Sequence, residues 1–420
     1  MAIQRPRGVN DLLPPFSGKW RAVEALFHEM CAEYGFKEIR TPLFEDTDLF
    51  KRGVGENTDI VQKEMYTFED QGQRSLTLRP EFTASLCRAY IENKMHGLPQ
   101  PQKLYCLGPL FRYERPQAGR FRQFHQFDIE IIGTISPLAD AECIVFCWDF
   151  YNRLNLRDLT LRLNSVGCPA CRSVYRLALQ EYLRPAIAKL CPNCQGRFER
   201  APLRILDCKC EICRAAAIGA PAIVDYLCAE CSEHYHMVQE ILQACAIPYT
   251  ADSSLARGLD YYTKTVFEIC ALGLGAQNAV CGGGRYDGLI EIIGGAPTPA
   301  MGVALGMERM LTALAAQNED IDVEEGIDAF IATDFNDAST VLAAFALASS
   351  LRSSGVLTAM DYEVKSLKSQ LKTANRLQAA YVVILGRPEV SAGIAQIKNM
   401  VSGEQSEIEL KQVRRYLLEH

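Results

Sequence analysis

The chain has 420 residues, 48% hydrophobic and 23% charged, so it can bury the cores of two or three globular domains. Its 44 basic and 51 acidic residues give a net charge of −7, which excludes a uniformly basic nucleic-acid-binding surface but permits a local basic patch. Residues 1–8 include no apolar signal segment, and the longest uncharged apolar stretch, 338–351, is too short to cross a bilayer. We therefore expect a cytoplasmic protein, not bound to membranes, whose cysteines are core thiols or metal ligands rather than disulfides.

The first predicted elements are a helix and two strands. Apolar residues recur at helical spacing over 19–35, and Gly35 marks the end of that helix. An extended segment follows over 36–44. Residues 101–133 alternate between apolar and polar side chains, which predicts two strands joined by a loop near 116–119.

The second half of the chain suggests an insertion and a separate domain. Nine of the 17 cysteines lie between Cys168 and Cys231, so we expect an insertion over about 168–248 within a first domain that spans 1–325. The acidic segment 318–325 is typical of a solvated linker. Beyond it, a strand at 327–332, a helix at 338–353 and a strand at 381–385 predict a small α/β domain with parallel strands over 326–420.

The strand over 121–133 has two chemically different faces. At a period of two residues, Phe124, Gln126, Asp128 and Glu130 share one face, while the other face is mostly apolar and can pack against a core. The polar face could line a binding site, or it could simply face water.

Arginines flank the predicted loop before this strand. They occupy positions 112, 115, 120 and 122, with Glu114 among them. Because the guanidinium group makes forked contacts with phosphate oxygens, a strand–loop–strand of this kind can bind a polyphosphate. The aromatic ring of Phe124 could stack on a base. The alternative is a set of ordinary surface arginines.

Six segments together resemble the histidyl-tRNA synthetases, which are class II aminoacyl-tRNA synthetases. Residues 111–133 are similar to motif 2 of that class, and the other similar segments are GFKEIRTPLFE (35–45, motif 1), LTLRPEFTA (76–84), LARGLDYYT (255–263), CGGGRYDGL (281–289) and GVALGMERM (302–310, motif 3). The resemblance extends over essentially the whole chain, in the family's order.

The resemblance implies an α+β fold and defined partners. It implies a catalytic domain built on an antiparallel sheet, a mostly helical insertion that contacts the tRNA acceptor stem, and a C-terminal α/β anticodon-binding domain. It also implies a homodimer formed through motif 1, and an enzyme that activates L-histidine with ATP and transfers it to its tRNA. In the last domain Lys365, Lys368, Lys372 and Arg376 have the spacing of one helical face and could contact RNA phosphates, or could be a solvated face.

The resemblance also implies roles for residues around ATP. Arg112 and Arg257 would be catalytic, with Arg112 contacting the α-phosphate and the substrate carboxylate and Arg257 lying across the α-phosphate. Arg309 and Arg120 would hold the β- and γ-phosphates. Glu114 would approach the adenine or its metal environment, and Phe124 would stack on the adenine. Magnesium is expected with the nucleotide.

The histidine site implied by the resemblance uses polar partners for both ring nitrogens. Glu130 and Tyr262, next to Tyr261, would meet the imidazole, and the α-amino group would be held by Glu81, Thr83 and Gln126. The glycines at 282–284 and 288 would let the backbone approach a ligand or a neighbouring strand closely. Phe82 stands where the family often has glycine, so it could narrow the pocket or pack away from it.

The cysteines of the insertion form four pairs with the spacing of metal ligands. Such short spacings let a turn direct two thiolates at one ion, and eight ligands would suit two structural Zn²⁺ sites. Reduced, unliganded thiols are the alternative. The paired residues are Cys168 and Cys171, Cys191 and Cys194, Cys208 and Cys213, and Cys228 and Cys231.

Two other functions are compatible with parts of the pattern. One is a histidine-sensing regulatory subunit of ATP phosphoribosyltransferase, a non-catalytic relative of the synthetases that typically lacks the C-terminal domain. The other is an RNA-binding or stress-sensing module on an inactive synthetase fold. The arginines at every phosphate-binding position, and residues 326–420, favour the enzyme over both.

Overall fold

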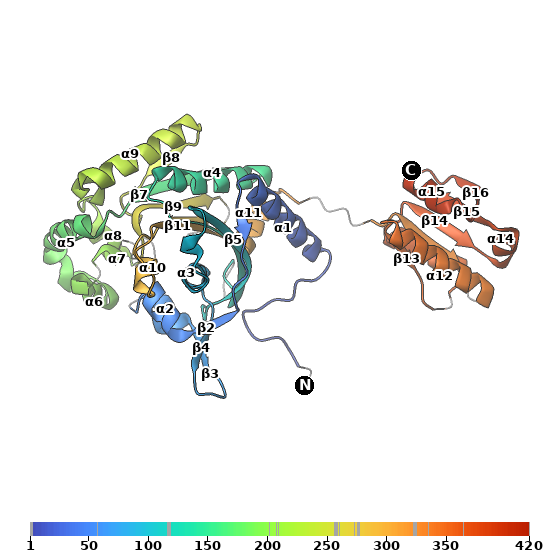
Figure 1. The fold of residues 1–420 in the computed structure, drawn as a ribbon, viewed down its shortest axis with the longest axis horizontal. Helices are drawn as coiled ribbons and strands as arrows, with labels where there is room; N and C mark the ends of the chain where they lie inside the picture. Colours follow the sequence, from blue (N-terminus) through green and yellow to red (C-terminus); the bar gives the residue numbers. More distant parts are fainter. Residues whose placement is uncertain are drawn as a thin grey trace. The chain divides into compact units, whose positions relative to one another are not determined.

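The computed structural model describes residues 3–56, 58–115, 119–200, 202–206, 208, 210–255, 259, 261–272, 274, 278–321, 326–334, 336–363 and 365–419. The chain forms two compact units, one that runs mainly from Trp20 to Ile321 and one made mainly of the residues that follow (Figure 1). No helix among the described residues has the length and apolar character needed to span a bilayer.

An eight-stranded sheet is the centre of the first unit. Its neighbours pair antiparallel except at the two edges, where β1 pairs with β5 and β7 with β8 in parallel. The predicted antiparallel sheet is therefore confirmed. The strand order is β1 (Lys37–Glu38), β5 (Gln102–Phe111), β6 (Gln123–Ile132), β11 (Ala300–Gly306), β10 (Ala279–Arg285), β9 (Thr263–Ala271), β7 (Leu159–Ser165) and β8 (Tyr249–Ala251).

Helices pack against one face of this sheet, and aromatic side chains are prominent in the core between them. The helices α1 (Phe16–Glu33), α4 (Pro137–Arg153) and α11 (Met307–Ala316) contribute most of the helical side chains that are buried there. Phe27 of α1 stacks on Phe127 of β6 with their ring centroids 4.5 Å apart. Because Phe127, Ile129 and Ile131 enter this core, the alternate residues of β6 face the opposite side, as their period of two predicts.

A smaller sheet and several short helices frame that opposite side. The sheet has the order β2 (Phe44–Asp46), β4 (Ser75–Leu78), β3 (Tyr66–Glu69). The end of β4 leads directly into Arg79, Pro80 and Glu81. The accompanying helices are α2 (Thr47–Val54), η1 (Ile60–Glu64), α3 (Thr83–Glu92), η2 (Met95–Gly97) and α10 (Leu289–Ile292).

The insertion between β7 and β8 is helical, as predicted. Its buried residues share one core with Leu86 of α3 and Leu104 of β5, and include Tyr175, Leu179, Cys194, Phe198 and Cys213. Figure 1 shows its helices gathered at one side of the large sheet. They are α5 (Pro169–Leu183), η3 (Arg184–Lys189), α6 (Pro192–Arg200), α7 (Leu203–Leu206), α8 (Glu211–Ala217), η4 (Ile223–Tyr226) and α9 (Ala229–Ala244).

The second unit contains a five-stranded sheet of order β13-β12-β14-β15-β16. The pairs β12–β13 and β12–β14 are parallel, as predicted for the strands near 327–332 and 381–385, whereas the added pairs β14–β15 and β15–β16 are antiparallel. A short turn joins β15 to β16, and such a hairpin can only pair antiparallel. The elements are β12 (Ala329–Thr333), α12 (Ala338–Ser353), β13 (Thr358–Met360), α13 (Leu367–Arg376), β14 (Tyr381–Leu385), α14 (Arg387–Ala392), β15 (Ile394–Asn399), β16 (Gln405–Glu409) and α15 (Val413–Glu419).

The predicted basic stripe is shorter than its spacing suggested. Helix α13 begins at Leu367 because the side chain of Ser366 caps it by accepting a hydrogen bond from the backbone N–H of Ser369. Lys365 therefore lies before the helix, where it pairs with Asp361 at 2.6 Å. Lys368, Lys372 and Arg376 are exposed on the helix itself.

Candidate active site

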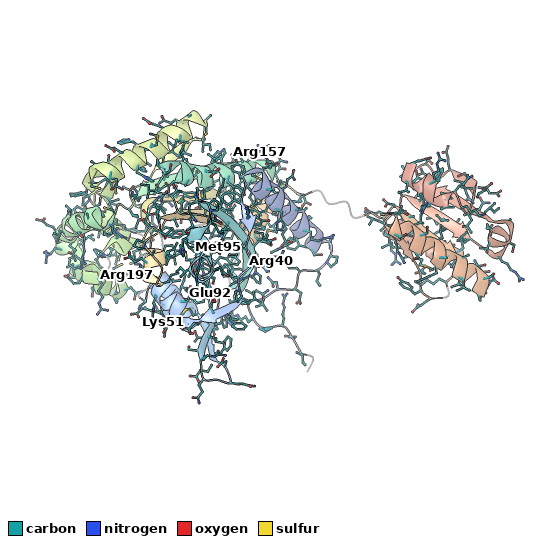
Figure 2. All side chains as sticks on the ribbon, viewed as in Figure 1. Arg40, Lys51, Glu92, Met95, Arg157 and Arg197 are labelled. Carbon is teal, nitrogen blue, oxygen red and sulfur yellow. The ribbon has the colours of Figure 1, made fainter. Side chains whose placement is uncertain are left out.

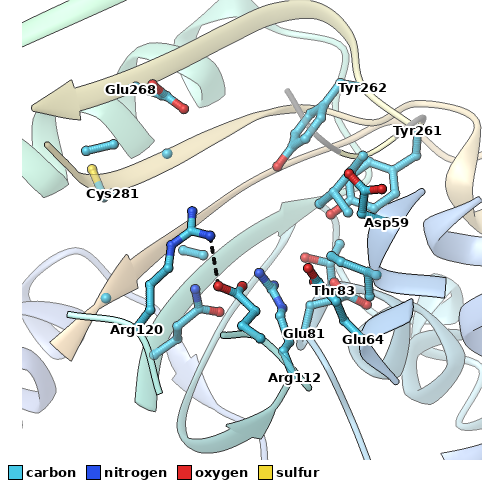
Figure 3. A pocket seen from close by; sticks show the side chains of 18 of the residues that line it. Asp59, Glu64, Glu81, Thr83, Arg112, Arg120, Tyr261, Tyr262, Glu268 and Cys281 are labelled. Atoms are coloured by element: carbon cyan, nitrogen blue, oxygen red, sulfur yellow. Dashed lines mark hydrogen bonds and ion pairs between the residues drawn. The ribbon is translucent and has the colours of Figure 1, made fainter. Parts of the chain in front are cut away.

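A cavity of about 690 Å³ opens on the polar face of β6, between this strand, β10, β11 and the insertion. It gathers residues that are far apart in the sequence, and Figure 3 shows several of their side chains directed into it. Nine of the residues predicted to bind ATP or histidine line this cavity: Glu81, Thr83, Arg112, Glu114, Arg120, Gln126, Tyr261, Tyr262 and Arg309. Arg257 lies outside the described residues.

One end of the cavity is strongly cationic. Arg120 donates a hydrogen bond to Glu114 at 2.8 Å, which orients its guanidinium group (Figure 3). Burial lowers the pKa of Arg309 from its usual range, and the nearby positive charge of Arg120 lowers it further. A bound polyanion would offset the electrostatic repulsion between these two guanidinium groups, so this end of the cavity suits the phosphates of a nucleotide.

Arg112 is held in the middle of the site by two contacts. Its Nε atom donates a hydrogen bond to the carbonyl oxygen of Pro80 at 2.9 Å, and its guanidinium carbon lies 5.1 Å from the centroid of the Phe124 ring. Phe124 thus supports Arg112 and is not among the described residues that line the cavity. Its stacking on an adenine remains a prediction.

The other end of the cavity offers an unsatisfied carboxylate. Glu81 is buried, and its Oε1 atom accepts a hydrogen bond from the backbone N–H of Ala84 at 2.9 Å. Its Oε2 atom finds no partner among the described residues, and burial raises the pKa of this carboxyl. A buried acceptor without a partner is costly, so a ligand ammonium group would satisfy it.

Glu130 lies just beneath the cavity surface. Its side chain is fully buried; Oε1 accepts a hydrogen bond from the hydroxyl of Thr83 at 2.8 Å and Oε2 accepts one from Tyr286 at 2.5 Å. Burial raises the pKa of Glu130 to about 8, although both hydrogen bonds lower it. Direct contact of this carboxyl with an imidazole ring remains a prediction.

This buried acid predicts a stability that depends on pH. In the folded protein Glu130 keeps its proton up to a pH of about 8, whereas in the unfolded chain it releases the proton near its ordinary value of 4.5. The folded state therefore binds more protons between these values, and the free energy of unfolding should fall as pH rises from about 5 to about 8, by up to about 1.4 kcal/mol per unit. Burial also raises the pKa of Glu81 and Asp128, which act in the same direction.

Urea denaturation of the ligand-free protein across this pH range measures the effect. We expect Glu130→Gln to make the free energy of unfolding depend less steeply on pH, by an amount that corresponds to up to one proton released on unfolding. Glu291→Gln changes an exposed glutamate and should leave this pH dependence as it is in the wild type. Equal slopes for wild type and Glu130→Gln would show that Glu130 ionises normally in the folded protein.

Tyr286 and Asp128 are site residues that the sequence analysis did not assign. Asp128 lines the cavity on the same strand face as Gln126, so its position in the period-two pattern was the available signal. Tyr286 belongs to the RYDG segment that follows the glycine run, but nothing in that segment indicated its bond to Glu130. Phe82 is buried and packs beneath the guanidinium group of Arg79, away from the described cavity lining.

Two glycines of the run have the close backbone contacts predicted for them. A Cβ atom at Gly283 would lie 2.3 Å from the carbonyl oxygen of Gly302, and one at Gly284 would lie 2.7 Å from that of Thr265. Gly288 is the N-cap residue of α10, and a Cβ atom there would meet no protein atom within 4 Å, so its close approach to a ligand stays a prediction.

The eight paired cysteines of the insertion form two clusters, each with its four sulfur atoms within 4.8 Å of one another. Cys168, Cys171, Cys228 and Cys231 form the outer tetrad, and Cys191, Cys194, Cys208 and Cys213 form the inner tetrad. The Sγ atoms of Cys168 and Cys171 are 3.5 Å apart and those of Cys191 and Cys208 are 3.9 Å apart. A zinc tetrathiolate with Zn–S bonds of about 2.3 Å has sulfur–sulfur edges of about 3.8 Å, so both clusters fit the ion.

Hydrogen bonds from backbone N–H groups at the starts of helices stabilise thiolates at two of these positions. They help to lower the pKa of Cys168 and of Cys191 to about 7, against the effect of burial. Burial raises the pKa of the other thiols at the helix starts, those of Cys171, Cys194, Cys213 and Cys231. The backbone N–H of Cys191 donates to the sulfur of Cys213 at 3.2 Å, and that of Cys228 donates to the sulfur of Cys171 at 3.1 Å. Such hydrogen bonds are expected of sulfur atoms that carry charge and bind a metal.

Comparison with known proteins finds relatives of both units of the chain. The family model described as histidyl-tRNA synthetase matches residues 8–189 and 211–310, and a model described as an anticodon binding domain matches residues 329–420. The chain is 52% identical to the histidine–tRNA ligase of Desulforamulus reducens, with 98% of each chain covered, and 52% identical to that of Desulfitobacterium hafniense, with 98% of this chain and 96% of the relative covered.

A solved structure agrees with these sequence matches. The apo histidyl-tRNA synthetase of S. aureus superimposes with a TM-score of 0.85 at 40% identity, covering 99% of this chain and all of the other. Matches of this extent, over both units and over the cavity-lining motifs, establish that the chain belongs to the histidyl-tRNA synthetase family.

Proposed function

We propose that the chain is a histidine–tRNA ligase. An oxygen of the histidine carboxylate attacks the α-phosphorus of ATP, pyrophosphate leaves, and a hydroxyl at the 3′ end of the tRNA then attacks the carbonyl of the adenylate to release AMP. The single observation that carries the proposal is the cavity that unites the cationic end at Arg120 and Arg309, the central Arg112, and the amine-accepting end at Glu81.

The residues at the two ends of the cavity would bind different substrates, ATP at one end and histidine at the other. Arg112 and Arg257 would stabilise the charge that develops at the α-phosphate, while Arg120 and Arg309 would hold the outer phosphates. Glu81, Thr83 and Gln126 would bind the α-amino group, and Glu130, Tyr261 and Tyr262 would recognise the imidazole. Glu114 would approach the adenine or its metal environment, and magnesium would accompany the nucleotide.

Histidine-dependent exchange of pyrophosphate into ATP tests this proposal. We expect exchange with histidine and none with the other amino acids, followed by histidine attachment to its tRNA. A folded protein that binds ATP but supports neither reaction would favour the histidine-sensing regulatory subunit instead. The match of residues 329–420 to an anticodon-binding model supports the ligase over that alternative.

The domains would then have separate roles. Residues 1–325, with the insertion at about 168–248, would activate histidine, and residues 326–420 would bind the tRNA anticodon region through the exposed Lys368, Lys372 and Arg376. The active form would be a homodimer in the cytoplasm.

We also propose that each cysteine tetrad binds one structural zinc ion. The purified protein should contain two zinc ions per chain, measured by mass spectrometry of the metal. Their removal with a strong chelator should lower the midpoint of thermal unfolding by on the order of 10 °C, because structural zinc contributes directly to folding free energy. Protein from zinc-supplemented cells that holds no metal, yet melts unchanged with the chelator, would exclude both sites.

A further inference from the structure

The inner tetrad is part of the active-site wall, unlike the outer one. Cys191 and Cys208 line the same cavity as Tyr261 and Tyr262, whereas no outer-tetrad cysteine is among the described residues that line it. The inner sulfur atoms therefore lie beside the substrate cavity and are not confined to the interior of the insertion.

The segment between the two inner cysteine pairs carries cationic side chains to the cavity. Arg197 lies one turn after Cys194 on α6, and Arg204 lies on α7; both line the cavity. Nη2 of Arg197 is 3.5 Å from Oδ2 of Asp59, another cavity-lining residue, which immediately precedes η1. Figure 2 labels Arg197 on the insertion, and Figure 3 draws Asp59 toward the Tyr261 and Thr83 side of the cavity, away from Arg120.

This segment has little structure that could hold it in place alone. Helix α6 has nine residues and α7 has four, and isolated helices shorter than about 12–15 residues are marginal in water. Phe198 and Ile205 are its buried apolar anchors. The four cysteines fasten both of its ends, so a metal ion bound by them would fix the segment between them.

The same segment lies outside the residues that the family model matches. The histidyl-tRNA synthetase model leaves residues 190–210 unmatched, and this gap contains three of the four inner cysteines together with Arg197 and Arg204. The wall is therefore separate from the part of the chain that the family model describes.

We propose that a metal ion in the inner tetrad fixes a wall that closes the histidine end of the cavity, so that occupancy of this site sets the affinity for histidine. The inference rests on the proposed ligase function and deepens it. The ion performs no chemistry; it holds the segment that carries Arg197 against Asp59, and this contact lies at the end of the cavity near Tyr261. Arg197 is a positioning residue, not a catalytic one.

Two matched cysteine variants test the role of the metal in pyrophosphate exchange. Cys208 and Cys210 both line the cavity and lie two residues apart, but only Cys208 belongs to the tetrad. We expect Cys208→Ser to lose one of two zinc ions and to raise the KM for histidine about tenfold, with a smaller change in the KM for ATP and in kcat. Cys210→Ser should keep both ions and the wild-type KM for histidine.

A second pair of variants keeps the proposal testable if Cys208→Ser fails to fold. Arg197→Ala should retain both zinc ions and raise the KM for histidine about threefold, as expected for a partly exposed ion pair, whereas Arg200→Ala, exposed on the same helix, should change nothing. The inference is overturned if wild type holds one zinc ion or none, if Cys208→Ser loses an ion with KM unchanged, or if Arg197→Ala behaves like Arg200→Ala. Failure of the ligase function itself is distinct, because wild type would then show no histidine-dependent exchange.

Discussion

Replacing Arg112 by alanine is expected to lower kcat/KM for histidine-dependent pyrophosphate exchange by about 10²–10³-fold. The hydrogen bond to Pro80 and the Phe124 ring fix the direction of this guanidinium group before any substrate binds. A donor oriented in advance stabilises charge that develops at the α-phosphate without reorganisation, so its loss falls mainly on the transition state. Most of the decrease should therefore appear in kcat.

A neighbouring arginine provides the matched control for this variant. Arg115 lies in the same segment, is exposed, and is not among the described residues that line the cavity. We expect Arg115→Ala to keep exchange within about twofold of wild type, since exposed substitutions away from a site have small effects. If Arg112→Ala and Arg115→Ala gave equal rates, general positive charge rather than the orientation of Arg112 would be responsible.

Local patterns in the sequence predicted one wall of this site well. The period of two along β6 separated the apolar residues that meet Phe27 from Gln126 and Asp128, because side-chain direction in a strand depends only on position. The family resemblance then supplied the arginines, and the cavity brings Arg112, Arg120 and Arg309 together. The alternation along β6 and the arginine-containing motifs each occupy a short stretch of sequence, so they could be recognised without knowledge of the fold.

Contacts between distant elements could not be predicted in the same way. Glu130 is bonded by Thr83, 47 residues before it, and by Tyr286, 156 residues after it, so its burial beneath the cavity follows only from how α3, β6 and β10 pack. The cysteine spacing likewise predicted four pairs but not their partners. Packing of the insertion helices brings Cys168 and Cys171 together with Cys228 and Cys231. It also brings Cys191 and Cys194 together with Cys208 and Cys213.

The buried position of Glu130 predicts a large effect at Gly302, its partner across the β6–β11 ladder. A Cβ atom at Gly302 would lie 1.5 Å from Oε2 of Glu130, so Gly302→Ala must displace this carboxyl and break its hydrogen bond with Tyr286. We expect the free energy of unfolding to fall by about 2–4 kcal/mol, from overpacking together with the lost buried hydrogen bond. We also expect kcat/KM for histidine in exchange to fall by about 10²-fold or more, because misplacing a group that holds the substrate has effects of this size.

A double-mutant cycle isolates the cause of this effect. Glu130→Ala removes the atoms with which the new methyl group collides, so adding Gly302→Ala to it should cost little further stability in urea denaturation. Gly288→Ala is the control for the substitution itself, since a Cβ atom there meets nothing within 4 Å and the φ angle of −95° is ordinary. If Gly302→Ala cost as much stability in the Glu130→Ala background as in wild type, the strain would come from the strands themselves, and Glu130 would not explain why glycine occupies this position.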